Sequence, residues 1–176
     1  RTLTAQGDQQ QFQDCITEYP NLHFNLINAS ECTQIELAER IAAVRGNSVL
    51  LYLNLFEDKD RNVYTIESGG SFIAAHARVP VFRFSIGALD NGILGGIMIS
   101  FEESGRQAGS MVREILQQGR RPQQIPVVMD TPVYGYFDKN VLDRYDVPLW
   151  KLPDGSRILH RDPSFFELHR KLSIAA

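Results

Sequence analysis

The sequence predicts an α/β fold, a layered and mostly parallel sheet with helices packed against it. Helical and extended segments alternate along the chain, an order that leads to parallel strands joined by right-handed crossovers. The extended segment 48–56, SVLLYLNLF, is apolar on both alternating faces in its first half. Such a run is typical of a strand covered on both sides, as in parallel sheets. The length of 176 residues fits one domain, or one domain with a short extension.

The first half of the chain is predicted to contain three helices and two strands. Residues at helical spacing predict a helix over 8–19 that ends before Pro20, and its apolar face holds Phe12, Cys15, Ile16 and Tyr19. Thr33 and Glu36 have the spacing of a capping box, which starts a second helix that ends at 45–47. The buried residues expected in it are Ile35, Ala38, Ile41 and Ala42. After the strand 48–56 and a charged loop at 57–62, a helix over 67–78 leads to a strand over 81–86.

The second half begins with a glycine-rich stretch, 87–96, which we interpret either as a hinge or as plain tight turns. A strand over 97–101 and a long helix over 103–118 follow, and Gly119 caps the helix. Its expected buried residues are Ala108, Met111, Val112, Ile115 and Leu116. Two more extended pieces, 126–129 and 133–137, precede a short helix capped by Asp138. A last helix is expected to carry Phe165, Leu168 and Leu172.

Composition excludes several classes of function. The formal net charge of −3 gives no field for binding a nucleic-acid backbone, so no nucleic-acid partner is expected. No apolar run approaches the roughly 18–20 residues of a membrane-spanning helix. Cys15 and Cys32 can either pair in an oxidising compartment or serve as small core residues, and the helical spacing of Cys15 favours the core.

Catalytic and metal-binding motifs are absent from the sequence. It contains neither a GxSxG elbow nor a phosphate-binding glycine loop, and its four histidines lack ligand spacing. The charged loop 57–62 is interpreted as a solvated loop. We therefore expect no catalytic residue, no metal and no cofactor, and no enzymatic activity in this segment.

Ligand binding is predicted from the fold class, because open parallel sheets bind ligands beyond the carboxyl ends of their strands. That rule selects loops near residues 6–7, 28–30, 54–58 and 85–91, together with two tyrosines on the last extended piece. From these loops we take the candidate ligand-binding residues Gln6, Asn54, Glu57, Ser85, Asp90 and Tyr136.

A family resemblance rests on the second half of the chain. The stretch GGIMISFEESGRQAG at 95–109, followed by ILQQG and QIPV, resembles the type 1 periplasmic-binding-protein family. Within it, the segment is most similar to substrate-binding proteins of ABC transporters for tryptophan or tyrosine. The tail, with LDRYDVP, LPDGS and PSFFELHR, is similar to substrate-binding-like sensor regions that precede a membrane helix. Such regions occur in bacterial histidine kinases and diguanylate-cyclase-type signalling proteins.

The resemblance implies a three-layer Rossmann-like lobe, with a mostly parallel sheet and helices on both faces, like the second lobe of a two-lobed clamshell. Residues 1–147 would form the substrate-binding-like lobe, within which 95–129 would cross to the other lobe. Residues 148–176 would form an extension leading towards a membrane helix. Because the chain is too short for both lobes, we expect the apolar face of the helix 103–118 to need the missing first lobe or a second copy, as in a homodimer.

The function implied is an extracytoplasmic sensor of a small, amino-acid-like ligand in a membrane-anchored bacterial signal-transduction protein. In that arrangement the lobe lies on the periplasmic or extracellular side and is attached to the inner membrane through the parent protein. The alternative is the substrate-binding component of an ABC-type transporter. A third hypothesis is an α/β enzyme whose catalytic residues lie on the missing part.

Overall fold

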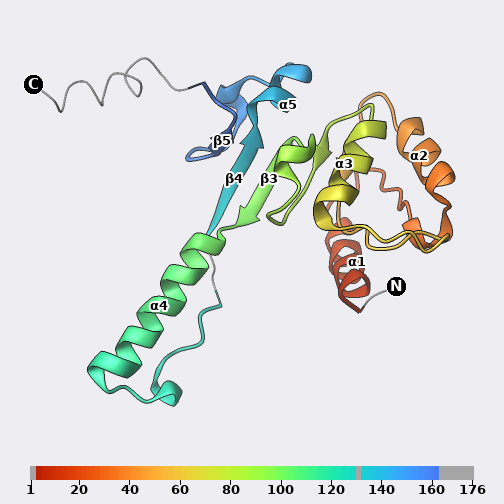
Figure 1. The fold of residues 1–176 in the computed structure, drawn as a ribbon. Helices are drawn as coiled ribbons and strands as arrows, with labels where there is room; N and C mark the ends of the chain where they lie inside the picture. The colour runs from red at the N-terminus through yellow and green to blue at the C-terminus, as the bar shows by residue number, and fades with distance from the viewer. Residues whose placement is uncertain (1–2, 130–131, 163–176) are drawn as a thin grey trace, which may run out of the picture.

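A five-stranded sheet organises the molecule in the computed structural model, which describes residues 3–129 and 132–162 (Figure 1). The strands are β1 (Leu50–Leu51), β2 (Val81–Phe82), β3 (Gly95–Ile99), β4 (Val133–Asp138) and β5 (Arg157–Leu159). They lie side by side in chain order. All neighbouring pairs are parallel except β3 and β4, which are antiparallel. The predicted α/β class with a mostly parallel sheet is therefore confirmed.

The helices lie close to where the sequence predicts them, except that the first, expected over 8–19, runs over 3–16 and includes Gly7. They are α1 (Leu3–Ile16), α2 (Gln34–Ala43), α3 (Ile66–His76), α4 (Phe101–Gln118) and α5 (Lys139–Arg144). The capping box of Thr33 and Glu36 is present at α2, and the side chain of Asp138 accepts a hydrogen bond from the Asn140 amide at the start of α5. Gly119 ends α4 in the left-handed conformation (φ 66°) that favours glycine. These predictions are confirmed.

Two of the strands are shorter than predicted, because the expected strands 48–56 and 81–86 each reduce to two residues. Among the described residues, β1 pairs only with β2, at the edge of the sheet. β2 lies between β1 and β3 and bonds to both: the Tyr52 amide donates to the Phe82 carbonyl on one side, and the Leu94 amide to the Val81 carbonyl on the other. No strand forms at 126–129.

The core includes some residues that periodicity missed. The helix α2 buries Leu37 and Ile41, which lie one turn apart, whereas the expected core residue Ile35 is 73% exposed on another side of the helix. Ala38 and Ala42 are half-buried. Cys32 is fully buried, but Cys15 is exposed, and both thiols are free. The core interpretation is therefore right for Cys32 and wrong for Cys15.

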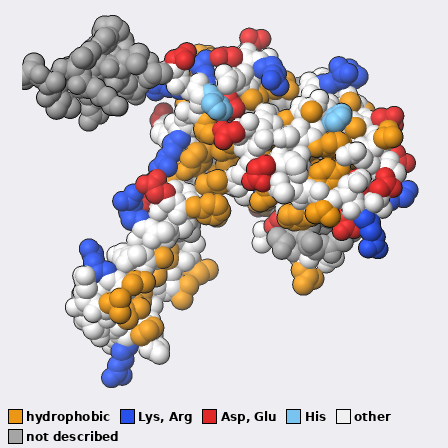
Figure 2. All heavy atoms as spheres, viewed as in Figure 1, with side chains coloured by type: hydrophobic (Ala, Val, Ile, Leu, Met, Phe, Trp, Pro, Cys, Tyr) orange, Lys and Arg blue, Asp and Glu red, His pale blue; other side chains and the backbone are white. Residues whose placement is uncertain are grey.

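The helix α4 and the segment 119–129 that follows it, which we call the arm, project away from the sheet (Figure 1). None of the residues of α4 is buried. Its expected core residues are only half-buried (Met111, Ile115) or exposed (Ala108, Val112, Leu116). Apolar side chains gather on the arm in Figure 2. The prediction of an internal helix is wrong, while the apolar face that suggested it remains uncovered.

Two sequence predictions concern the membrane and the tail. Over the residues that the structure describes, no helix has the length and hydrophobicity to cross a bilayer. The predicted last helix with Phe165, Leu168 and Leu172 lies outside the described residues.

Candidate functional site: a cavity between the 86–91 loop and strands β4 and β5

A cavity of about 480 Å³ lies between the loop 86–91 and the paired strands β4 and β5. The start of α3 contributes Glu67 to its wall, β4 contributes Tyr136, and all of β5 takes part. The complete lining is Glu67, Ile86, Gly87, Ala88, Leu89, Asp90, Asn91, Tyr136, Arg157, Ile158 and Leu159. The wall therefore combines apolar side chains with a few polar groups, as is usual for small-molecule sites.

Small residues hold the 86–91 loop against α3. A Cβ atom on Gly70 of α3 would come within 2.4 Å of the Cβ of Ala88, so only glycine permits this approach. Gly87 (φ 122°) and Ala88 (φ 59°) both adopt backbone conformations with positive φ. For alanine such a conformation is uncommon and is maintained by the surrounding structure.

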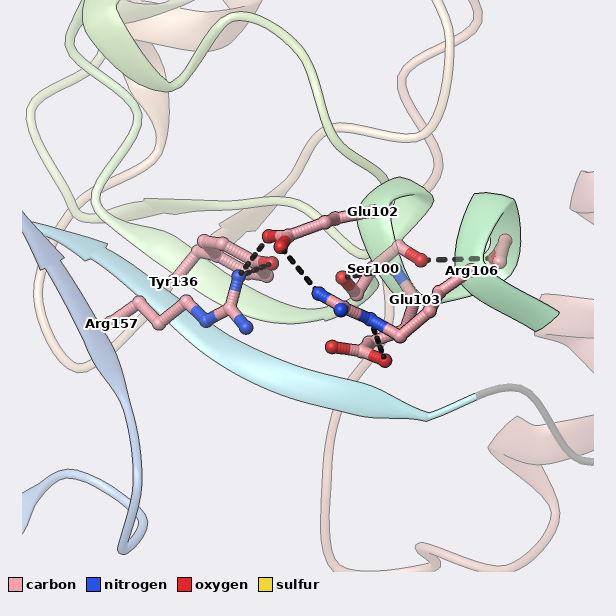
Figure 3. A network of polar contacts seen from close by, with 7 residues as sticks. Ser100, Glu102, Glu103, Arg106, Tyr136 and Arg157 are labelled. Carbon is pink, nitrogen blue, oxygen red and sulfur yellow. Dashed lines mark hydrogen bonds and ion pairs between the residues drawn. The ribbon is translucent and has the colours of Figure 1, made fainter. Parts of the chain in front are cut away.

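Arg157 of β5 connects the cavity to the base of the arm. Its Nη1 donates to the Tyr136 hydroxyl at 3.1 Å and lies 3.6 Å from a carboxylate oxygen of Glu102, in the first turn of α4 (Figure 3). The guanidinium also stacks over the ring of Tyr134, 4.5 Å from its centroid. Glu102 in turn pairs with Arg106 one turn along α4. The network thus joins β5, β4 and α4 at one side of the cavity.

His160 joins the cavity loop to the ends of β4 and β5. Its Nδ1 lies 3.2 Å from a carboxylate oxygen of Asp138, and its Nε2 lies 3.5 Å from one of Asp90. Asp138 is buried and also caps α5, while Asp90 is exposed at the cavity wall. The imidazole therefore bridges two carboxylates from different segments, and its own backbone has a positive φ of 54°.

The polar groups that line the cavity can bind charged and polar atoms of a small molecule. Two carboxylates, Glu67 and Asp90, and one guanidinium, Arg157, line it together with the Tyr136 hydroxyl. These groups can pair with the charged ends of a small polar molecule. Within residues 3–129 and 132–162, no three His, Cys, Asp or Glu side chains cluster closely enough to hold a metal ion.

Two of the six predicted ligand-binding residues line the cavity together, Asp90 and Tyr136. Ser85 lies next to it in sequence, and its carbonyl accepts a hydrogen bond from Arg83. Asn54 is half-buried and donates to the carboxylate of Asp8 in α1. Gln6 of α1 and Glu57, which forms an isolated β-bridge with Val63, are exposed and do not contribute to this cavity.

Sequence reasoning missed Glu67, Arg157 and His160. Glu67 lies in the first turn of α3, where acidic residues are common because they interact favourably with the helix dipole. Arg157 and His160 lie at 148–176, which we predicted to be an extension. The apolar residues Ile158 and Leu159 after Gly155 were the available signal for β5, but three residues are too few to distinguish a strand from a loop.

Comparison with solved structures finds a similar chain. It is described as the ligand-free, open structure of CD0873, a substrate binding protein with adhesive properties from Clostridium difficile. The TM-score is 0.61 at 18% sequence identity, over 88% of this chain and 51% of that chain. The two chains share a fold. This chain therefore has the fold of a substrate-binding protein, but spans about half the length of that structure. Neither family models nor curated proteins give a match.

Proposed function

We propose that this chain is the small-molecule-binding lobe of an extracytoplasmic sensor in a membrane-anchored bacterial signal-transduction protein. The observation that carries the proposal is the cavity of about 480 Å³ beside the 86–91 loop, in the fold of a substrate-binding protein. The sensor assignment draws on the tail motifs LDRYDVP and LPDGS. The ligand is a small, amino-acid-like molecule, whose charged ends suit Arg157 and the carboxylates of Glu67 and Asp90.

The mechanism we propose is a population shift. A ligand that binds one arrangement of the cavity more tightly stabilises that arrangement by its difference in affinity. Arg157 lines the cavity and also pairs with Glu102 at the base of the arm, so a ligand that engages Arg157 competes with this ion pair. The site thereby communicates with the arm, whose partner is a first lobe or a second copy. Residues 148–176 would carry the signal to a membrane helix of the parent protein.

The alternative function is the substrate-binding component of an ABC-type transporter, which the likeness to a substrate-binding protein favours equally. The coding sequence beyond Ala176 separates the two. An apolar span soon after Ala176 supports the sensor, whereas a stop codon there supports the transporter component.

The binding activity is tested by thermal unfolding in a screen of amino acids and related small molecules. A ligand present at 100 times its Kd adds about 2.7 kcal/mol to the free energy of unfolding. For a chain of this size, that corresponds to a rise in Tm of about 5–10 °C. Asp90→Ala removes a cavity carboxylate and should reduce the shift, while Asp154→Ala, an exposed residue away from the cavity, should retain it.

Recovery of the ligand distinguishes binding from catalysis. A binding lobe returns the compound unchanged after incubation, as measured by mass spectrometry. Conversion of the compound would favour the α/β enzyme hypothesis instead. An equal shift in the Asp90→Ala and Asp154→Ala variants would place the ligand outside this cavity.

A further inference from the structure

A buried arginine with no carboxylate partner among the described residues lies just before the cavity loop 86–91 in the sequence. Arg83 follows β2 directly and is 3% exposed. Its Nε donates to the Ser85 carbonyl at 2.9 Å, and its Cζ lies 4.4 Å from the centroid of the Tyr52 ring. The Nη1 atom is buried and has no hydrogen-bond partner among the described residues. In the same part of the chain, no carboxylate lies within ion-pair distance of this guanidinium.

Burial of such a guanidinium lowers the free energy of unfolding unless an anion pairs with it. A guanidinium does not lose its proton in proteins, so burial cannot neutralise it as it can a lysine. An uncompensated buried charge costs several kcal/mol, and each buried donor without a partner adds to that cost. The stacking on Tyr52 offsets part of it, but leaves Nη1 without an acceptor.

The position of Arg83 is where a ligand is expected in this fold class. Tyr52 and Arg83 directly follow β1 and β2, so they lie at the carboxyl edge of the parallel part of the sheet. A chain of contacts leads from there to the cavity: Tyr52 lies against Gly70, and Gly70 lies against Ala88, which lines the cavity. Burial raises the pKa of the Tyr52 hydroxyl, and the nearby Arg83 opposes this rise.

We infer that Arg83 is a second, buried anion-binding residue, separate from Arg157, which takes a small carboxylate onto its Nη1. The inference goes beyond the proposed function, and this anion site can be tested alone. Because Arg83 is 3% exposed, a carboxylate reaches its guanidinium only when neighbouring residues move. Ser85, whose carbonyl accepts a hydrogen bond from Arg83 Nε, is one of these neighbours.

The test uses the whole chain and acetate as the probe. Acetate is titrated at constant ionic strength against a bulky sulfonate buffer, and Tm is followed. The wild type should show a saturating rise of about 5 °C or more at 100 times the Kd for acetate. Arg83→Met should lose this rise, whereas Arg78→Met, which changes an exposed arginine, should keep it. Equal acetate responses in the wild type and Arg83→Met would overturn the inference.

A second measurement needs no folded variant. The Nε–H signal of a buried arginine is observable by NMR in the wild type, and for Arg83 it should shift with acetate along the same saturation curve as Tm. A signal that stays constant while Tm rises would place the acetate elsewhere and overturn the inference. The outcome is also independent of the proposed function: a metabolite that stabilises the wild type and Arg83→Met equally would support the lobe as a binder while rejecting Arg83 as its anion site.

Discussion

At the scale of single residues, Asp58 shows how one buried carboxylate organises a loop. Its Oδ1 accepts from the amides of Asp60 and Asn62, and its Oδ2 accepts from the Asn62 side chain and the Tyr64 hydroxyl. Burial by itself would raise the pKa of Asp58, but these hydrogen bonds favour the charged form, so that the pKa lies below its ordinary value. The loop 57–62, predicted to be fully solvated, is thus built around a buried anion.

The substitution Asp58→Asn should lower the free energy of unfolding by about 1–3 kcal/mol at pH 7, because the new amide cannot accept from the Asn62 side chain. Because folding lowers the pKa of Asp58, its carboxylate stabilises the fold fully above its unfolded pKa of about 3.9. This stabilisation is lost as the pH falls through the folded pKa. The wild type should therefore lose more stability than Asp58→Asn between pH 5 and pH 2, as measured by urea unfolding. Asp60→Asn is the control, since that side chain is exposed; equal pH profiles for Asp58→Asn and the wild type would contradict this account.

At the scale of elements, the packing of β2 against β3 depends on a glycine. A Cβ atom on Gly96 of β3 would come within 1.9 Å of the carbonyl oxygen of Arg83. Gly96→Ala should therefore force the two segments apart and cost about 3 kcal/mol or more. Gly109 of α4 has nothing within 4 Å of such an atom, so Gly109→Ala should stabilise the helix by about 0.5–1 kcal/mol. Thermal unfolding of both variants checks the pair, and a tolerated Gly96→Ala would show that β2 and β3 are less tightly joined than described.

At the scale of the whole molecule, the exposed face of the arm is expected to determine the state of association. Val112 and Leu116 of α4 are 51% and 78% exposed. An apolar patch of this kind on an isolated chain favours association. We expect the wild type to form dimers or larger species at micromolar concentration in size-exclusion chromatography with light scattering. Val112→Glu combined with Leu116→Glu should give a monomer whose Tm does not depend on protein concentration, and a clean wild-type monomer would contradict the expectation.

How far the sequence could predict this molecule also differs by scale. Local chemistry predicts the cap of α2 at Thr33, the cap of α5 at Asp138 and the end of α4 at Gly119, because each depends on a few neighbouring residues. The mostly parallel sheet also follows from the order of the elements. Strand lengths do not, since they depend on how far each strand stays paired with its neighbours in the sheet.

Only part of the candidate site could be predicted from the sequence. Asp90 and Tyr136 could be predicted from the carboxyl-edge rule and an aromatic strand, and the structure places both at the cavity. Whether they bind a ligand remains a prediction. Arg157 and His160 could not be predicted, because their roles depend on β5 pairing with β4 and on the distance from His160 to Asp90. Arg83 lies inside the predicted strand 81–86, and only its burial in the structure distinguishes it from an ordinary strand residue.

The antiparallel pairing of β3 and β4 brings the two ends of the arm together at the sheet. Ile99 pairs with Val133, and the Ser100 amide donates to the Pro132 carbonyl, so the chain leaves and re-enters the sheet at the same point. The arm is topologically an insertion between the two strands of a β-hairpin. A change in the length of the arm beyond its first turn leaves the order of the strands unaffected. The first turn itself stays linked to the cavity wall through the pair of Glu102 and Arg157.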